Sequence, residues 1–344
     1  MVDKPVRIQD VARAARVSTA TVSRALSTPD KLSEETRKAV FEAIRLTGYR
    51  VNQAARNLRM QRAGAVLILV PNLSNPFFSQ ILAGISGVFM ETDYSVLIAD
   101  TRARGADDTR LVDYSLARVD GIISLDGGLR PEIMAEFADR GAGDRMLFAC
   151  EWVQDTPLPS VRSDNVTGAR LAIQHLYDLG HRNIAHVTGP EDNVLTHARR
   201  TGMLEQRARL GLPVQEDWII RGDFSLDSGR DAARRILEMA HRPTAVFCAS
   251  DQVAFGLIST LTAAGVRVPE DLSVVGFDDI ELSEYYVPAL TTIRQFRRTL
   301  GARAARLLLD RLTGARPDLP DGDVLMVDVE LVVRDSTAPP PSGR

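Results

Sequence analysis

The chain has 344 residues, 44% of them hydrophobic, and a formal net charge of −3 at pH 7. A chain of this size can bury a large core and is expected to form more than one domain. No apolar run approaches the ~18 residues of a membrane span, the N-terminus lacks a signal-peptide core, and two cysteines cannot form a disulfide framework. These features argue against membrane and disulfide-rich secreted proteins and predict a cytoplasmic location.

Charge is unevenly distributed along the chain. Residues 1–62 contain 13 lysine and arginine residues and 6 acidic ones, a net charge of +7, whereas the remaining residues carry −10. All of the lysines, Lys4, Lys31 and Lys38, lie in this first part. A basic N-terminal part joined to an acidic remainder attracts phosphate groups at one end, which favours nucleic acid as a partner.

Residues 8–26 hold the most informative pattern in the basic part. Apolar residues at helical spacing predict a first short helix that ends before Arg16, and Ser18 can cap a second helix that begins at Thr19. The second helix leaves small polar groups and one arginine facing outward, which fits a DNA major groove. The alternative is an ordinary helical hairpin with a solvated face. We expect DNA contacts from Ser18, Thr19, Ala20, Thr21, Ser23 and Arg24.

A third helix and a linker follow. Ser33 can cap this helix, Glu34 and Glu35 suit its first turn, and Gly48 can end it. The Arg-rich segment 50–62 could form only a short helix, which is unstable alone in water. We therefore predict an all-α DNA-binding head over residues 1–49 and a hinge linker over 50–62 that becomes ordered on DNA.

From residue 65 the pattern changes to buried strands that alternate with amphipathic helices. The expected strands are 65–70, 95–100, 121–125, 146–150, 184–188, 218–222, 245–249 and 273–277, and the clearest expected helices are 76–90, 165–179, 225–239 and 252–264. This alternation predicts parallel sheets covered on both faces, and the number of strands suggests two doubly wound lobes. Ligands of such sheets bind beyond the carboxyl ends of the strands.

Several motifs together make the chain resemble the lactose/galactose-repressor family of bacterial transcription regulators. They are DVARAARVSTATVSRAL, NPFF at 75–78, HLYDLGHRNIAHVTGP, SDQVAFG at 250–256, and VPEDLSVVGFDDI followed by LTTIRQ. The resemblance implies a helix-turn-helix head, a hinge helix and a two-lobed α/β core like that of periplasmic sugar-binding proteins. It also implies a homodimer on a pseudo-palindromic double-stranded DNA operator, controlled by a small-molecule effector.

The resemblance also sets the expected domain boundaries. The core spans 63–335, with an N-lobe of about 63–162 plus 292–322 and a C-lobe of about 163–291 plus 323–335. The Pro-rich tail, 336–344, contains no leucine heptad for a coiled coil and is expected to be disordered.

Carried onto this sequence, the family's base-reading positions fall at Thr19, Ala20 and Arg24. Its leucine wedge, which opens a base step through the minor groove, falls at Leu58. The other hinge positions expected at DNA are Asn52 and Ala55.

Three positions depart from the family pattern. Arg16 stands where a turn glycine is usual, Val51 where proline is common, and Arg59 where a small residue normally follows the leucine. The missing proline and the extra charge weaken the expectation of a stable hinge helix and favour a looser spacing of the two operator half-sites.

The resemblance further implies an effector pocket at the carboxyl edge of the strands. NPFF opens a helix after the first strand, so its two aromatic rings can pack on the apolar face of a sugar while charged planar groups bind the hydroxyls. Positions matching those of ribose-type relatives are Asn75, Phe77, Phe78, Arg199, Phe224, Asp278 and Gln295, and Ser250, Asp164 and Asp126 are further lining candidates.

One pair of positions differs from the free-ribose pattern. Relatives that bind free ribose carry Asp-Arg where this chain has Glu151-Trp152. The exchange of an arginine for an indole suggests a ligand with a flat extension, such as a nucleoside base stacked on Trp152. We therefore expect a nucleoside or pentose-type sugar as effector, with a hexose or a sugar derivative as the alternative.

Two other classes of protein fit the sequence less well. A transport-type sugar-binding protein would share the lobes but not the basic head. An enzyme would need catalytic motifs, and no Walker A loop, GxSxG or HExxH motif is present. The histidines show no metal-ligand spacing, so we expect neither enzymatic activity nor a metal or other cofactor.

Overall fold

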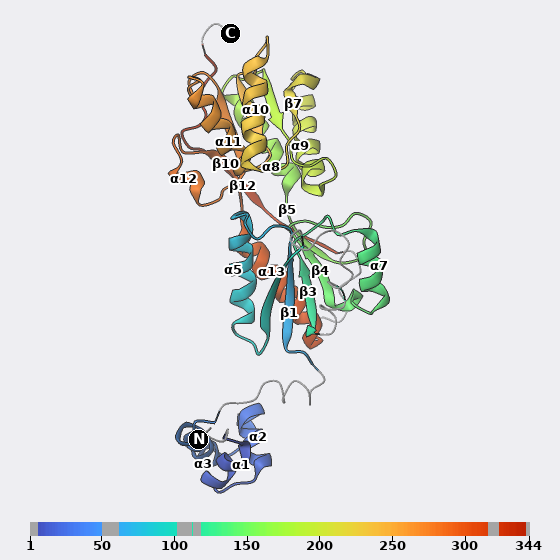
Figure 1. Ribbon diagram of the computed structural model, residues 1–344, viewed down its shortest axis with the longest axis vertical. Helices are drawn as coiled ribbons and strands as arrows, with labels where there is room; N and C mark the ends of the chain where they lie inside the picture. Colours follow the sequence, from blue (N-terminus) through green and yellow to red (C-terminus); the bar gives the residue numbers. More distant parts are fainter. Residues whose placement is uncertain (1–5, 50–61, 102–111, 113–117, 316–322, 342–344) are drawn as a thin grey trace, which may run out of the picture. The chain divides into compact units, whose positions relative to one another are not determined.

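The computed structural model describes residues 6–49, 62–101, 112, 118–315 and 323–341. The chain divides into two compact units, Met1–Ala63 and Gly64–Arg344, which we call the head and the core. The described part of the head is helical, whereas the core alternates strands and helices (Figure 1).

The described residues of the head form two short helices joined by a tight turn, followed by a longer helix. These are α1 (Ile8–Ala14), α2 (Thr19–Ser27) and α3 (Glu34–Thr47), with a 3-10 turn at Pro29–Lys31. The predicted helix-turn-helix is therefore confirmed, including its third helix.

Side-chain caps and a small apolar core hold the head together. The Ser18 hydroxyl accepts a hydrogen bond from the backbone N–H of Thr21 at 3.1 Å, and Ser33 caps α3 in the same way. Each such cap stabilises a helix by about 1 kcal/mol. The fully buried side chains, one from each helix, are Val11, Val22 and Val40.

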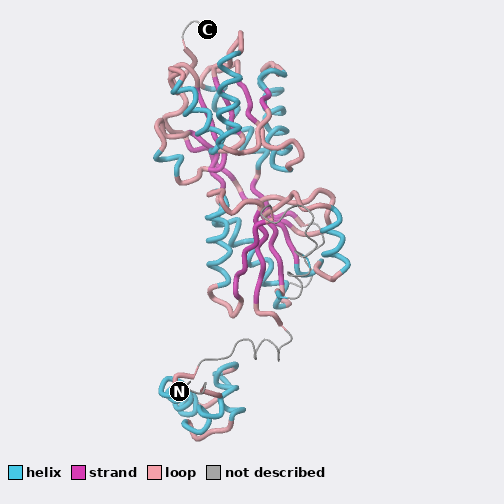
Figure 2. Tube along the Cα trace, in the orientation of Figure 1, coloured by secondary structure: helices cyan, strands magenta, loops and turns pink. Residues whose placement is uncertain are grey.

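The described residues of the core form two six-stranded sheets, one for each lobe (Figure 2). The first sheet is parallel throughout, with the strand order β11-β5-β4-β3-β1-β2. Its strands are β1 (Ala65–Val70), β2 (Ser95–Asp100), β3 (Gly121–Ser124), β4 (Met146–Ala149), β5 (Ser160–Ser163) and β11 (Val324–Val327).

The second sheet has the order β12-β10-β9-β8-β6-β7. It is parallel except at its edge, where β12 runs antiparallel to β10. Its strands are β6 (Ile184–Val187), β7 (Ile219–Ile220), β8 (Ala245–Cys248), β9 (Ser273–Asp278), β10 (Thr291–Gln295) and β12 (Val329–Val332). The predicted architecture of two doubly wound, mostly parallel sheets is confirmed.

Helices cover both faces of each sheet. Successive strand residues point to opposite faces, and they are apolar on both faces. On the first sheet, α5 (Phe77–Phe89) and α13 (Arg297–Thr313) lie on one face and α7 (Pro131–Asp139) on the other (Figure 1). On the second sheet, α8 and α9 pack on one face and α10 and α11 on the other. The bounds of these helices are Asn165–Asp178, Val194–Leu210, Leu226–Glu238 and Asp251–Ala263, and α12 spans Leu282–Tyr285.

Two glycines let α5 and α13 approach closely. A Cβ on Gly84 would clash with the backbone oxygen of Arg298, and a Cβ on Gly301 would clash with that of Ile81. Any side chain at either position would push the two helices apart, so this contact requires glycine.

The structure contains strands that the sequence did not predict. These are β5, β10, β11 and β12, and the connections between the lobes run from β5 to α8, from β10 to α13 and from β11 to β12. β5 reads SVRS and lacks an apolar run. β11 (VLMV) and β12 (VELV) are largely apolar but only four residues long, and a run that short does not distinguish a strand from a helix.

The predicted lobe boundaries need correction at two places. β10, at 291–295, belongs to the second sheet rather than to the N-lobe, and β11, at 324–327, belongs to the first sheet rather than to the C-lobe. The chain therefore changes lobes after each of these strands, a few residues later than expected.

The prediction of a disordered tail over 336–344 is wrong for residues 336–341. Ser336 is fully buried, and its hydroxyl accepts from the Thr291 N–H at 2.8 Å and donates to the Val274 carbonyl at 2.6 Å. His181 also lies 2.8 Å from the Ala338 oxygen. Proline-rich sequence prevents secondary structure, but hydrogen bonds from the second sheet hold this segment in place.

Candidate functional site: a DNA-reading head and a cavity between two lobes

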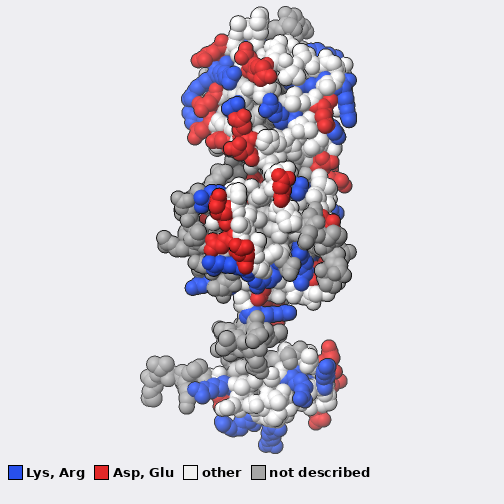
Figure 3. All heavy atoms as spheres, turned by 90° about the vertical axis from the view of Figure 1, so that its right-hand side faces the viewer, with Lys and Arg blue, Asp and Glu red and all other residues white. Residues whose placement is uncertain are grey.

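The outer face of α2 carries the side chains predicted to read DNA. Ser18, Thr19, Ala20 and Arg24 are exposed, and Thr21 and Ser23 are partly buried. Figure 3 shows Lys and Arg side chains spread over the surface of the head. The Thr21 hydroxyl lies 2.9 Å from that of Ser18, so part of its hydrogen-bonding capacity is used within the cap. The hinge positions Asn52, Ala55 and Leu58 lie outside the described residues.

Most of the predicted effector residues line one small cavity in the core. They come from both lobes and gather at the carboxyl ends of the strands, where doubly wound sheets bind ligands. The cavity has a volume of about 40 Å³, and the predicted residues that line it are Asn75, Phe77, Phe78, Glu151, Arg199, Phe224, Ser250 and Asp278.

Three lining residues were not predicted: Leu195, Gln252 and Ile280. Each lies close in sequence to a predicted residue, on the same helix or after the same strand. Gln252 belongs to the SDQVAFG motif, which was recognised without assigning a role to its glutamine. The apolar Leu195 and Ile280 carry no sequence signal that distinguishes them from core residues.

Arg199 is the most heavily engaged side chain at the cavity. It is 2% exposed, and its Nε donates to Asn165 Oδ1 at 2.9 Å while an Nη donates to the Ala249 carbonyl. Its other Nη lies 3.6 Å from Asp278 Oδ1, and its guanidinium carbon lies 3.8 Å from the centre of the Phe277 ring. Burial lowers the pKa of Arg199 and the nearby Asp278 raises it, so the charge is retained against desolvation.

Asp278 is the acidic counterpart of Arg199. Burial raises the pKa of its carboxyl group, whereas Arg199 and then Arg297 lower it. Gln295 donates to Asp278 Oδ1 at 2.7 Å, so the predicted residue Gln295 acts through Asp278 and does not line the cavity.

A second buried carboxylate, Asp251, supports the loop that follows Asp278. One of its oxygens accepts from the Ile280 N–H at 2.8 Å and from the Ser283 hydroxyl at 2.7 Å, and the other accepts from Thr292. Burial is the main cause that raises the pKa of Asp251, and the neighbouring Asp278 raises it further.

Strained backbone surrounds the cavity. Among the described residues, six other than glycine have positive φ, and four of them lie here: Cys150, Phe224, Asp278 and Asp279, with φ of 71°, 68°, 122° and 51°. Such conformations cost of the order of 1–3 kcal/mol each and cluster at ligand sites, where the surrounding structure enforces them. The Ser250 hydroxyl helps to hold the strained backbone at Phe224, because it donates to the Phe224 carbonyl at 3.1 Å.

Two predicted residues beside the cavity occupy different environments. Glu151 is buried and accepts from the Gly127 N–H at 3.0 Å. Trp152 is not among the lining residues, and the guanidinium carbon of Arg162 lies 3.8 Å from its ring centre. One face of the indole is therefore covered, so base stacking on that face finds no support here. The weaker candidates, Asp126 and Asp164, also do not line the cavity.

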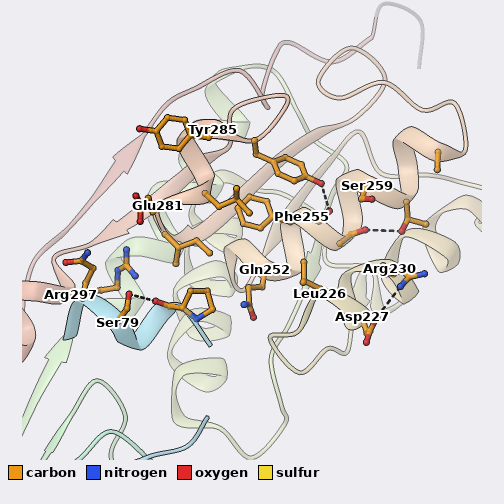
Figure 4. Close-up of a pocket in the computed structure, with 18 of the residues that line it drawn as sticks. Ser79, Leu226, Asp227, Arg230, Gln252, Phe255, Ser259, Glu281, Tyr285 and Arg297 are labelled. Carbon is orange, nitrogen blue, oxygen red and sulfur yellow. Dashed lines mark hydrogen bonds and ion pairs between the residues drawn. The ribbon is translucent and has the colours of Figure 1, made fainter. Parts of the chain in front are cut away.

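A much larger groove lies on the surface beside the cavity, with a volume of about 1120 Å³. It runs between the start of α5 and helices α10, α11 and α12 (Figure 4). Gln252 and Ile280 line both spaces and separate them. Three apolar side chains at the groove are strongly exposed: Leu226, Leu282 and Tyr285, at 49%, 50% and 71%.

Comparison with known proteins decides the family. Residues 7–52 match the family described as bacterial regulatory proteins, lacI family, and residues 173–337 match a periplasmic binding protein-like domain. The chain is also 39% identical to the HTH-type transcriptional repressor CytR of Escherichia coli strain K12, over 96% of each chain. The chain belongs to the LacI family. As a member of the LacI family it is a DNA-binding transcriptional repressor and not an enzyme, as the sequence predicted.

Solved structures of LacI-family proteins agree with the fold. The lac repressor dimer bound to operator and the anti-inducer ONPF is 31% identical, with a TM-score of 0.81 over 97% of this chain and 100% of that one. A LacI-family regulator from Enterococcus faecium with bound ribose is 29% identical, with a TM-score of 0.71 over 80% of this chain and 99% of that one. LacI-family repressors bind operator DNA and small-molecule effectors. None of the described helices could span a membrane, and the described residues contain no cluster of metal-binding side chains.

Proposed function

We propose that a nucleoside or a pentose binds at the cavity between the lobes and sets the affinity of this repressor for its operator in the cytoplasm. The observation that carries the proposal is the meeting of aromatic rings from one lobe with buried charged groups from the other. Phe77 and Phe78 lie edge to face, with ring centres 5.2 Å apart, and can pack against the C–H face of a sugar ring. Arg199 and Asp278 can bind its hydroxyl groups by charge-assisted hydrogen bonds.

The size of the cavity couples binding to movement. A volume of about 40 Å³ leaves room for only a few water molecules, since about 10–15 Å³ of such space holds one. A pentose or nucleoside is several times larger, so the side chains or the lobes must separate to admit it. Where the lobes separate, the bound and free proteins differ in lobe spacing, and a ligand that prefers one spacing shifts the population toward it.

Arg297 is placed to transmit such a movement. It belongs to α13 of the first lobe, and one Nη donates to the Phe77 carbonyl at 3.1 Å. The other Nη donates to the Asp279 carbonyl, on the second lobe, at 2.9 Å. A change in lobe spacing at the cavity must break or reshape this bridge, which is buried and costly to leave unpaired.

The nucleoside is the effector we favour. The motifs STATVSRALSTPDKLSEETR, GPEDNVLTHARRTG and RGDFS resemble the cytidine repressor within the family. The relative with bound ribose supports a pentose ring as the common element of the ligand. Glu151 also lines the cavity, and its carboxylate can accept hydrogen bonds from the base of a nucleoside.

We further propose that two copies of the chain form the active dimer through the apolar groove lined by Leu226, Leu282 and Tyr285. Exposed apolar surface of this extent is typical of protein interfaces, and the lac repressor relative is a dimer. In this dimer, the exposed face of α2 in each head reads one operator half-site, with Thr19, Ala20 and Arg24 contacting bases and Leu58 in the hinge opening the central step.

Calorimetry on the full-length chain tests the proposal. Cytidine, uridine, adenosine, ribose, glucose and galactose are each titrated into the wild type, the Asp278→Asn variant and the Arg200→Gln variant. Arg200 is an exposed neighbour of Arg199 and does not line the cavity. We expect nucleosides or ribose to bind the wild type and Arg200→Gln, and Asp278→Asn to lose most of the affinity. Binding by hexoses alone, or equal binding by all three proteins, would contradict the proposal.

A further inference from the structure

The turn between α1 and α2 is a Schellman motif with an arginine at its left-handed position. The Val17 N–H donates to the Ala12 carbonyl at 3.0 Å, and the Arg16 N–H donates to the Arg13 carbonyl at 3.3 Å. This pair of bonds requires a residue with positive φ after the helix, and Arg16 has φ of 54°. Glycine normally occupies this position, because any Cβ there is strained.

Every other described helix that is followed by a left-handed residue has glycine at that position. Among the described residues, six helices are followed within two residues by a glycine with positive φ: Gly48, Gly141, Gly180, Gly211, Gly265 and Gly314. The end of α1 is the exception. Four of the other positive-φ residues that are not glycine surround the effector cavity, where strain accompanies ligand binding. Arg16 is thus a strained residue in the other functional unit of the chain.

Nothing in the described part of the head compensates for this strain. The Arg16 side chain is exposed, and it forms no hydrogen bond, ion pair or ring contact with any described residue. In contrast, Arg13, one turn earlier, lies 3.4 Å from Asp10. A charged side chain that is kept in a strained position without an intramolecular partner is available for a partner outside the protein.

We propose that Arg16 binds a phosphate of the DNA backbone at the edge of the groove that α2 enters. This inference rests on DNA reading by α2. Arg16 lies two residues before Ser18, the cap of α2, and the first residues of a recognition helix are those that reach the base edges. The turn before them therefore faces the rim of the groove, where the phosphates lie. A guanidinium group binds a phosphate with two parallel hydrogen bonds and fixes the orientation of the head on the duplex.

Glycine at position 16 removes the backbone strain and the phosphate contact together, and two different measurements report the two effects. In the full-length Arg16→Gly variant, the left-handed turn is relaxed and the phosphate contact is lost. The variant should therefore bind DNA more weakly while its head becomes more stable. A residue with only a structural role would change stability without a matching change in the salt dependence of DNA binding.

The experiment compares Arg16→Gly, Arg16→Lys and Arg45→Gln with the wild type. Arg45 is exposed on α3 and its removal changes the net charge by the same amount. The probes are a duplex selected from a random library by the wild type and a random-sequence duplex of equal length. Affinity is measured by anisotropy across a range of salt concentrations, and the stability of α1 and α2 by amide hydrogen exchange.

For Arg16→Gly we expect a severalfold loss of affinity on both duplexes, with the slope of log affinity against log salt reduced by about 0.9 for each head bound. Its α1 and α2 amides should exchange severalfold more slowly. Arg16→Lys should retain the wild-type salt dependence, and its α1 and α2 amides should exchange at the wild-type rate. Arg45→Gln should change neither the salt dependence nor the exchange rate. A slope unchanged in Arg16→Gly, or a loss confined to the selected duplex, would overturn the phosphate contact. If the wild type bound no DNA, operator binding itself would fail, which is a distinct result.

Discussion

The ion pair between Arg199 and Asp278 offers the sharpest test of which interactions stabilise the core around the cavity. Replacing Arg199 with methionine keeps much of its volume but leaves Asp278 buried, at 7% exposure, without its closest cation. Removing one partner of a buried ion pair typically costs about 3–5 kcal/mol. Replacing Asp278 with asparagine should cost less, about 1–2 kcal/mol, because Arg199 keeps its bonds to Asn165 and Ala249. Asparagine has nearly the same shape as aspartate, so the exchange adds little backbone strain at this positive-φ position.

The double variant should recover part of the loss, with a coupling energy of about 1.5–3 kcal/mol. Urea unfolding monitored by tryptophan fluorescence measures these changes in the core alone, because both tryptophans, Trp152 and Trp218, lie there. Arg200→Met, at the exposed neighbouring position, is the matched control and should cost less than about 0.5 kcal/mol.

The cost of Arg199→Met should also depend on pH. Burial raises the folded-state pKa of Asp278 above its unfolded value, so its contribution to stability is present at low pH and is lost as the pH rises through the folded pKa. Arg199 is the largest influence that opposes this shift, and its removal raises the pKa further. The penalty should therefore be small near pH 4 and larger at neutral pH. A penalty below 1 kcal/mol at pH 7, or one independent of pH, would refute this account of the pair.

Three further predictions concern other parts of the core. Asp251→Asn should flatten the pH dependence of core stability above neutral pH, since burial raises the pKa of the carboxyl group and its ionisation destabilises the fold as the pH rises; equal pH profiles for variant and wild type would contradict this. Leu282→Asp should convert the dimer into monomers in sedimentation velocity, whereas Val333→Asp, exposed outside the groove, should not. Gly301→Ala should destabilise the core by about 1–3 kcal/mol in urea unfolding, because α5 and α13 must separate, whereas Gly87→Ala, which meets open space, should not.

The head could be predicted from sequence because its signals are local. A serine before each helix and one apolar stripe per helix define α2 and α3, and both elements match the expectation. The glycine expected at the first turn is replaced by Arg16, and the turn keeps the left-handed backbone that glycine would serve. Arg16 therefore breaks the sequence pattern of this turn, but the backbone conformation of the turn is the one that glycine usually adopts.

The core was less predictable where long-range pairing decides the outcome. β5 and β11 pair with each other although they are more than 150 residues apart, and the β5 sequence, SVRS, shows no apolar run. Ser336 looks like a residue of a disordered tail until the Val274 carbonyl and the Thr291 N–H are placed beside it. Such contacts depend on the assembled sheet and leave no local trace in the sequence.

The candidate effector site was also only partly predictable from the sequence. The resemblance to ribose-type relatives predicted Asn75, Arg199 and Asp278, and in the structure these residues line one cavity at the carboxyl ends of the parallel strands. The contact between Arg162 and Trp152 could not be predicted, since it depends on how two strand ends lie side by side. The volume of the cavity likewise follows from side-chain packing and not from residue type.

The central claim is that this repressor reads a specific DNA site with an affinity set by a small ligand. The most direct test is an anisotropy titration of the full-length protein on its selected duplex and on a random duplex, with and without the nucleoside or sugar identified by calorimetry. We predict at least ~10³-fold tighter binding to the selected duplex and a change of at least ~5-fold on adding the ligand. Equal affinity for both duplexes, with and without every ligand tested, would contradict it.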